Sequence, residues 1–252
     1  MDKHLITAAL LGLALAAAPI AGASAAELKV IAGGGMTVPL KELGPQFERS
    51  TGHKVDIQFA ATPELIKMAT SGNPLDLAVV PVDVMKDAGA RAKFAPEPPT
   101  DIARVGFGVA VKAGAPKPDV STPDALKQTL LKAQSITFLP ESAAGSYVMK
   151  VFDRLGIGEA MKAKTRAQKI PGDIPRAVAN GDAELGVFLT NVLIAPGVEF
   201  AGPFPGDLQQ DLVFTGAVAS DSKDKAAAKA FLDYLRTPEA MAVLKAKGMR
   251  PG

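Results

Sequence analysis

The stretch Leu28-Lys29-Val30-Ile31-Ala32-Gly33-Gly34-Gly35-Met36-Thr37 sets the fold of this chain. Its apolar run, Leu28–Ala32, predicts a strand that ends in three glycines. A helix is then expected over Val38–Ser50, with Pro39 in the first turn, where its missing N–H is not needed. The unit repeats as a strand over Val55–Phe59 followed by a helix over Thr62–Ser71. Strands that alternate with helices in this way predict an α/β fold.

A second α/β series follows the Pro-rich segment at residues 93–99. The continuous apolar run Leu77–Val80 ends the first series and is typical of a strand buried on both faces. Strands over Ile102–Val111 and Leu212–Ala219 are predicted to cross between two lobes, which we place at residues 27–107 plus 213–252 and at residues 108–212. The other expected elements are strands Ser135–Leu139 and Leu185–Leu189 and helices Gly145–Leu155, Ile174–Asn180, Asp224–Arg236 and Glu239–Lys247. The Pro- and Gly-rich stretch Pro196–Gly206 is expected to separate the second series from the returning strand.

The composition excludes several classes of function. The chain has 252 residues, 28 Lys and Arg against 26 Asp and Glu, no Cys and two His. This charge balance excludes a nucleic-acid binder that works by bulk charge. The absence of Cys excludes disulfides, thiolate nucleophiles and Cys-ligated zinc, and two histidines exclude a His-rich metal site. We expect no metal and no cofactor.

Residues 1–26 have the layout of a secretory signal peptide. A short polar start, Met1–His4, is followed by the apolar run Leu5–Ile20 and then by small residues up to Ala26. The alternative is a membrane anchor, but the run is short for a bilayer span, and no charged stop-transfer cluster follows it. We expect cleavage near Ala25 or Ala26 and export of the mature chain to the periplasm.

Four loops between strands and helices are candidates for a binding site. Ligands of open α/β sheets bind beyond the carboxyl ends of strands, and helix N-termini offer free N–H donors to anions. Each loop alone is more typical of a tight turn than of a binding site. Together, their small and hydroxyl-bearing residues predict a site for a small anion, formed by Gly34, Gly35, Thr37, Ala61, Thr62, Ala144, Gly145, Tyr147, Ile174 and Arg176.

The side chains near these loops allow alternatives. Thr62 is expected to cap its helix, and Tyr147 either points into the cleft or packs on its own helix. Arg176 either binds a carboxylate or is an ordinary surface charge. Glu141 and Asp173 either form an acid–base pair or, as we favour, serve as a solvated carboxylate and a helix cap.

The segments 28–37, 47–55, 140–147, 173–178, 185–187 and 231–235 resemble the periplasmic molybdate-binding-type solute receptors of ABC transporters. The resemblance implies a type II periplasmic binding-protein fold of two α/β lobes with a ligand cleft between them and two crossing strands. It also implies a membrane ABC permease as partner. We expect the receptor to be a monomer.

The resemblance does not identify the ligand of this chain. Gly35, Ala61 with Thr62, and Leu189 stand where molybdate receptors place a serine, paired serines and a tyrosine. Residues 115–121, 142–147 and 195–203 are more similar to a branch of the same family that includes a periplasmic aconitate isomerase. We therefore predict a binding protein for an organic carboxylate or an oxyanion. The alternative is an isomerase of an unsaturated tricarboxylate, for which a general base is hard to find in the chain.

Overall fold

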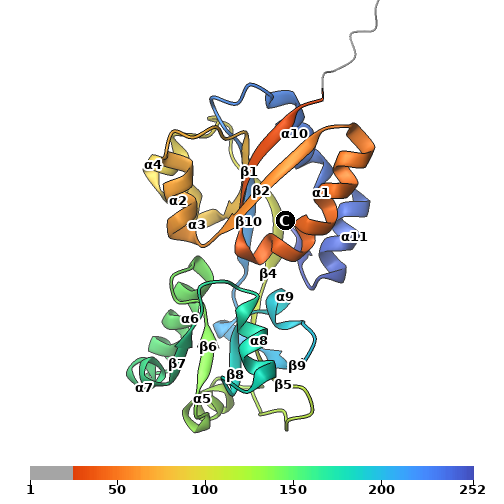
Figure 1. The fold of residues 1–252 in the computed structure, drawn as a ribbon. Coiled ribbons are helices and arrows are strands. Elements are labelled where there is room, and N and C mark those ends of the chain that lie inside the picture. The colour runs from red at the N-terminus through yellow and green to blue at the C-terminus, as the bar shows by residue number, and fades with distance from the viewer. Residues whose placement is uncertain (1–24) are drawn as a thin grey trace, which may run out of the picture.

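The computed structural model describes residues 25–252, which form two α/β lobes joined by two crossings of the chain (Figure 1). The predicted signal peptide lies outside the described residues except for Ala25 and Ala26. Between residues 25 and 252, no helix combines the length and the hydropathy that a membrane span requires.

Lobe 1 is built on a six-stranded mixed sheet in the order β11-β4-β10-β3-β1-β2. Strand β1 is parallel to β2 and β3, whereas β10 is antiparallel to its neighbours β3 and β4. The strands are β1 (Glu27–Gly33), β2 (Lys54–Ala60), β3 (Leu77–Pro81), β4 (Thr100–Val105), β10 (Leu212–Val218) and β11 (Arg250–Pro251).

Helices cover both faces of this sheet, because its strands are apolar on both sides. On one face, Ile31 and Val80 pack with residues of α2 (Thr62–Thr70), α3 (Val82–Lys86) and α4 (Ala88–Arg91). On the other face, Val30 and Val79 belong to the main core with α1 (Thr37–Thr51), α10 (Lys225–Tyr234) and α11 (Pro238–Ala246). The two groups of helices lie on opposite sides of the strands in Figure 1.

Lobe 2 is built on a five-stranded sheet in the order β7-β6-β8-β5-β9. Strand β6 is parallel to β7 and β8, and β5 is antiparallel to β8 and β9. The strands are β5 (Phe107–Lys112), β6 (Ile136–Phe138), β7 (Thr165–Ala167), β8 (Leu185–Leu189) and β9 (Val198–Pro203). The helices are α5 (Pro123–Lys132), α6 (Ala143–Arg154), α7 (Gly158–Lys164), α8 (Asp173–Asn180) and α9 (Thr190–Leu193), and short 3-10 turns occur at η1 (Gly34–Met36) and η2 (Gly206–Leu208).

The first crossing divides the strand that the sequence predicted over Ile102–Val111. Its first half, β4, pairs in the sheet of lobe 1, and its second half, β5, pairs in the sheet of lobe 2. The break falls at Gly106. Beside it, the Gln209 side chain binds the backbone of Phe107 twice, accepting its N–H and donating to its C=O, both at 2.8 Å. The second crossing leads from β9 through η2 to β10, and we propose that the lobe boundaries follow these changes of sheet, near residues 107 and 213.

Two other sequence predictions need correction. The stretch Pro196–Gly206 is more than a loop, because it contains edge strand β9, whose pairing with β5 shifts register between Val109 and Ala110. The helix predicted from Gly145 begins at Ala143, because the Ser142 hydroxyl accepts the Gly145 N–H at 2.9 Å and so caps the helix. Helix α7 and strand β7 had no sequence prediction.

One carboxylate ties the end of α1 to the start of β2. Glu48 accepts the Val55 N–H at 3.0 Å and binds Lys54 Nζ at 3.1 Å. Because both bonds favour the ionised form, the Val55 N–H first and Lys54 second, they lower the pKa of Glu48 below its usual value of 4.5.

The stabilisation that Glu48 provides is therefore expected to be lost in acid. It is fully present above the unfolded-state pKa of about 4.5 and disappears as the pH falls through the lower folded-state pKa. The difference in Tm between the wild type and Glu48→Gln should be largest at pH 7 and should shrink by pH 3, as measured by calorimetry. Glu159→Gln, at an exposed surface position, serves as control and should change little at any pH. A Glu48→Gln difference that stays constant with pH would contradict this assignment.

Candidate functional site

The carboxyl ends of three strands meet at the edge of lobe 1 that faces lobe 2. Strands β1, β2 and β3 end at Gly33, Ala60 and Pro81, and each leads within two residues into a helix. Across from them, β6 leads to α6 and β8 leads directly to α9. The first N–H groups of such helices have no partner within the helix and carry the positive end of its dipole. The junction between the lobes is therefore rich in backbone donors.

Two hydrogen bonds join the lobes at this junction. The Ala143 N–H, at the start of α6, donates to Thr62 Oγ1 of α2 at 2.9 Å. The Asn191 side chain of α9 donates through Nδ2 to the Gly35 carbonyl at 2.8 Å. These bonds hold the two lobes in a closed arrangement.

The space enclosed between the lobes is small and bordered largely by apolar groups. The cavity measures about 20 Å³, which is room for about one water molecule. None of the residues that line it carries a charged side chain. They are Gly34, Gly35, Ala60, Ala61, Thr62, Pro81, Leu139, Ser142, Ala143, Ala144, Pro171, Phe188, Leu189, Leu212 and Phe214.

A larger groove lies beside this cavity and shares Thr62, Ser142, Ala143 and Leu212 with it. Its volume is about 340 Å³, within the range of pockets that hold small molecules. Both lobes and the second crossing contribute to its walls, which consist of Thr62, Pro63, Val82, Asp83, Lys86, Phe107, Glu141, Ser142, Ala143, Ser146, Tyr147, Lys150, Gln210, Asp211, Leu212 and Val213. Across residues 25–252, His, Asp and Glu side chains nowhere gather in a group of three that could hold a metal ion.

The structure brings about half of the predicted site residues together. Gly34, Gly35, Ala61, Thr62 and Ala144 line the small cavity, and Tyr147 lines the groove. Four others line neither space: Thr37, Gly145, Ile174 and Arg176.

These four have other partners. The Thr37 hydroxyl donates to the Gly34 carbonyl, the Gly145 N–H to Ser142 Oγ, and the Ile174 N–H to the Pro171 carbonyl. The Arg176 side chain is 71% exposed and pairs with Asp173 at 2.6 Å. In contrast, the Ala144 N–H, in the first turn of α6, has no hydrogen-bond acceptor within the described chain.

Two helix caps differ from the sequence prediction. Ala61, not Thr62, is the N-cap of α2, so that Thr62 is the first helical residue and its hydroxyl reaches across to lobe 2. Gly172, not Asp173, is the N-cap of α8, because the Asp173 carboxylate is turned to Arg176 on its own helix.

The side chains of Tyr147 and His53 both form hydrogen bonds with backbone groups. The Tyr147 hydroxyl donates to the Leu208 carbonyl at 2.8 Å, and its ring packs on Phe107. Burial raises the pKa of Tyr147, which makes the phenol a weaker acid than usual. His53 accepts the Ala26 N–H at 3.0 Å, beside the start of β1, about 20 Å from the end of that strand at a rise of 3.3 Å per residue.

Three residues at the lobe junction were not predicted as site residues from the sequence. Asn191 follows a strand that was predicted correctly, and a buried amide next to a strand end is the only signal it offers. Phe214 lies within the predicted returning strand and was indistinguishable from a core residue. Ser142 begins the candidate loop at residues 142–147 but was not named as a site residue, and a serine directly before a helix is a typical N-cap, a signal that could have found it.

The comparisons with known proteins agree with this architecture. A profile of the family described as bacterial extracellular solute-binding proteins matches residues 28–250. The chain is 34% identical to an aconitate isomerase of a Pseudomonas species, over 100% of this chain and 98% of that protein. It is 30% identical to the molybdate-binding protein ModA of Azotobacter vinelandii, over 90% of each chain.

The same fold is found in solved structures. The periplasmic molybdate-binding protein of Azotobacter vinelandii superposes with a TM-score of 0.74 at 21% identity, over 89% of this chain and 99% of that one. The resemblance to a two-lobed binding fold that the sequence predicted is thereby confirmed.

Proposed function

The chain belongs to the family of bacterial extracellular solute-binding proteins, and from this premise we propose that it captures a small anion between its lobes. The observation that supports the proposal is the donor arrangement at the lobe junction. The Ala144 N–H has no acceptor in the described chain, and the Thr62 hydroxyl keeps its own proton while accepting the Ala143 N–H. Both groups border a cavity that no charged side chain lines, so the backbone and one hydroxyl supply the positive potential.

The receptor acts as part of an ABC importer, to whose membrane permease it delivers the solute. Closure of the lobes traps the ligand, since a ligand that contacts both lobes stabilises the closed form by contacts that the open form lacks. We propose the periplasm as its location, a cleaved leader that ends near Ala25 or Ala26, and a monomer as the working state.

A panel of anions tests the proposal by thermal shift. A ligand at 100 times its Kd stabilises the folded state by about 2.7 kcal/mol, which raises the Tm of a chain of this size by roughly 5–11 °C. The panel consists of molybdate, tungstate, sulfate and di- and tricarboxylates, with uncharged amides of the carboxylates as controls. If none of the anions raises the Tm, the proposal fails.

Thr62 provides a sharper test. The variant Thr62→Val keeps the shape of the side chain but removes both its donor and the acceptor of the Ala143 N–H. We expect binding of the anion to weaken at least tenfold, as a lost hydrogen bond to a charged group predicts. Thr70→Val is the matched control, because the Thr70 hydroxyl on the same helix binds only carbonyls of its own helix. Equal affinity of the two variants in calorimetric titration would contradict the role of Thr62.

A second candidate function is the isomerisation of an unsaturated tricarboxylate, favoured by the identity to the aconitate isomerase. Proton abstraction needs a base in the cleft. Tyr147 has a raised pKa and a hydroxyl engaged with Leu208, so Glu141, which lines the groove, is the better-placed group. Interconversion of cis- and trans-aconitate, followed by chromatography and abolished by Glu141→Gln, would establish the isomerase. Saturable binding without turnover would favour the receptor alone.

A further inference from the structure

The three glycines after β1 are covered by apolar side chains. A methyl carbon built on Gly33 would lie 2.7 Å from Phe214 Cε1, and one on Gly34 would lie 2.7 Å from Pro171 Cγ. On Gly35, it would lie 2.8 Å from Phe214 Cζ and 3.0 Å from Leu189 Cδ1. Carbon atoms do not approach this closely without a shift of their neighbours. These positions therefore cannot carry a hydroxyl-bearing side chain while the apolar cover is in place.

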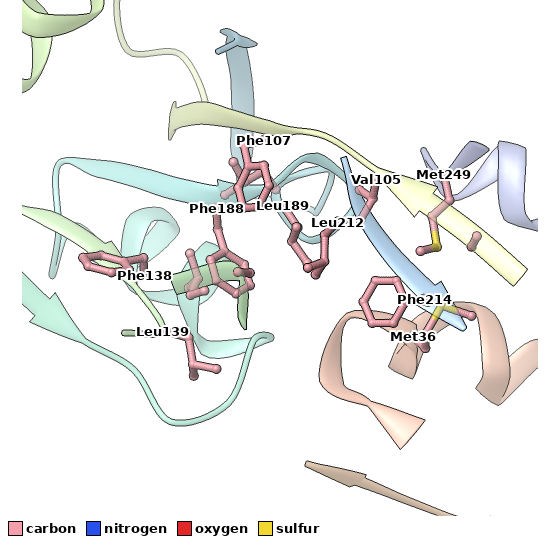
Figure 2. Packing of buried hydrophobic residues seen from close by; sticks show 14 of the residues in the cluster. Met36, Val105, Phe107, Phe138, Leu139, Phe188, Leu189, Leu212, Phe214 and Met249 are labelled. Carbon is pink, nitrogen blue, oxygen red and sulfur yellow. The ribbon is translucent and has the colours of Figure 1, made fainter. Parts of the chain in front are cut away.

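Both lobes contribute to this apolar cover, which consists of Phe214, Leu189 and Pro171. Phe214 lies on β10 of lobe 1, Leu189 ends β8 of lobe 2, and each is 1% exposed. Figure 2 shows Leu189 and Leu212 between Phe188 on one side and Phe214 on the other, as a continuous row of apolar groups across the junction. The cover is thus completed only when the lobes close.

Few polar side-chain groups line the cavity, and only Thr62 and Ser142 carry a hydroxyl there. Thr62 and Ala144 offer donors to the cavity, whereas Ser142 already donates to the Leu139 carbonyl and accepts the Gly145 N–H. A tetrahedral oxyanion has oxygens on all sides, and each oxygen that faces an apolar wall loses its hydrogen bonds to water without replacement. A carboxylate has its oxygens at one end and hydrocarbon at the other, so it needs few donors and can place its body against the apolar residues that line most of the cavity.

We infer that the cleft selects an organic carboxylate with a hydrocarbon body over tetrahedral oxyanions, and that Phe214 and Leu189 determine this specificity. The inference rests on the proposed function and narrows the class of anion that the protein binds. The carboxylate binds near Thr62 and Ala144, and its body extends toward the adjoining groove. There Phe107, Val82 and Leu212 offer apolar surface beside the charged side chains of Asp83, Lys86, Glu141, Lys150 and Asp211.

Calorimetric titration of the full mature chain tests the inference. The ligands are molybdate, sulfate and two homologous series, the straight-chain monocarboxylates and the straight-chain dicarboxylates. Affinity should rise about fourfold for each buried methylene until the body fills the space, since a CH₂ group contributes about 0.8 kcal/mol. Molybdate and sulfate should bind at least 100-fold more weakly than the best carboxylate.

The variant Phe214→Leu separates specificity from stability. A smaller side chain in the apolar cover makes room, so the preferred carboxylate should become longer by one or two methylenes. Phe231→Leu is the control, because Phe231 is fully buried in the core of lobe 1 away from the cleft and should lower the Tm without changing the ranking of ligands. Leu189→Val is a second variant with the same expected readout, in case Phe214→Leu does not fold.

The outcomes are distinct. Tighter binding of molybdate or sulfate than of every carboxylate would overturn the inference and leave the proposed anion receptor intact. An unchanged ranking in both Phe214→Leu and Leu189→Val would remove the specificity role of these residues. Failure of every anion to bind would overturn the proposed function and the inference together.

Discussion

Gly145→Ala is expected to be among the most destabilising single substitutions in the chain. Helix α6 starts directly against the preceding loop, and a methyl carbon on Gly145 would lie 1.9 Å from the Leu139 carbonyl oxygen and 2.7 Å from Pro140 Cα. Because both of these are backbone atoms, the steric clash can be removed only if the start of the helix moves. That movement also breaks the cap from Ser142. We expect a loss of roughly 4 kcal/mol or more, or a fall in Tm of about 8–16 °C, measured by calorimetry.

Gly172→Ala is the matched control, also at the start of a helix. Gly172 has ordinary helical torsions, φ −64° and ψ −16°, and nothing lies within 4 Å of an added methyl carbon. Alanine at this position lowers the conformational entropy of the unfolded chain, so the substitution should be neutral or should stabilise the fold by about 0.4–1 kcal/mol. Similar Tm values for the two variants would show that the loop before α6 adjusts freely, contrary to this account.

Asn191→Asp is expected to open the lobes. Asn191 is 8% exposed, its Nδ2 donates to the Gly35 carbonyl, and its Oδ1 has no partner among the described residues. Replacement of the amide by a carboxylate removes the donor and places a negative charge against a carbonyl oxygen in a dry environment. An unpaired buried charge costs about 3–5 kcal/mol, which would shift the ratio of closed to open forms at least 100-fold.

The sign of the pH effect distinguishes this mechanism from simple loss of packing. At acidic pH the new carboxyl group takes up a proton and can again donate to the Gly35 carbonyl, so the closed form should recover. Small-angle scattering should show a larger radius of gyration for the variant at pH 7 than at pH 4. Asn73→Asp, in an exposed loop, changes the net charge equally and should show no such dependence. An unchanged radius at both pH values would mean that Asn191 does not hold the lobes together.

Most of the fold follows from local patterns in the sequence. The strands around Val30 and Val187 were predicted to within a residue or two at each end, because a buried strand has a nearly continuous apolar run with a sharp end. The edge strand around Ile57 was predicted equally well, although its residues alternate between apolar and polar and are at most partly buried. Strand β9 was missed because its residues are only partly buried at a sheet edge, and its Gly202 and Pro203 are typical of a loop. The break at Gly106 was missed because a change of sheet leaves the apolar run uninterrupted.

The site was less predictable than the fold. Gly34, Gly35 and Thr62 could be found because strand ends and helix starts are visible in sequence. The function of Asn191 arises only when the two lobes meet, whereas Phe214 covers Gly33 and Gly35 within lobe 1. Each residue contacts a glycine more than 150 residues away in the chain, which a local sequence pattern cannot show. Arg176 was a reasonable candidate by residue type, but its own helix supplies a partner in Asp173, an interaction that ordinary i,i+3 spacing allows.

The strand order of lobe 1 also determines when this chain can fold. Strand β10 lies between β3 and β4, which follow each other in sequence but do not pair. Until residues 212–218 are available, β3 and β4 within residues 27–105 therefore each have an unpaired strand edge where the middle of the sheet should be. Lobe 2 is formed by one continuous segment and has no such requirement. A chain still emerging from the ribosome can complete lobe 2 first, while lobe 1 stays unfinished until nearly the whole polypeptide has been made. The last forty residues therefore control the completion of the fold.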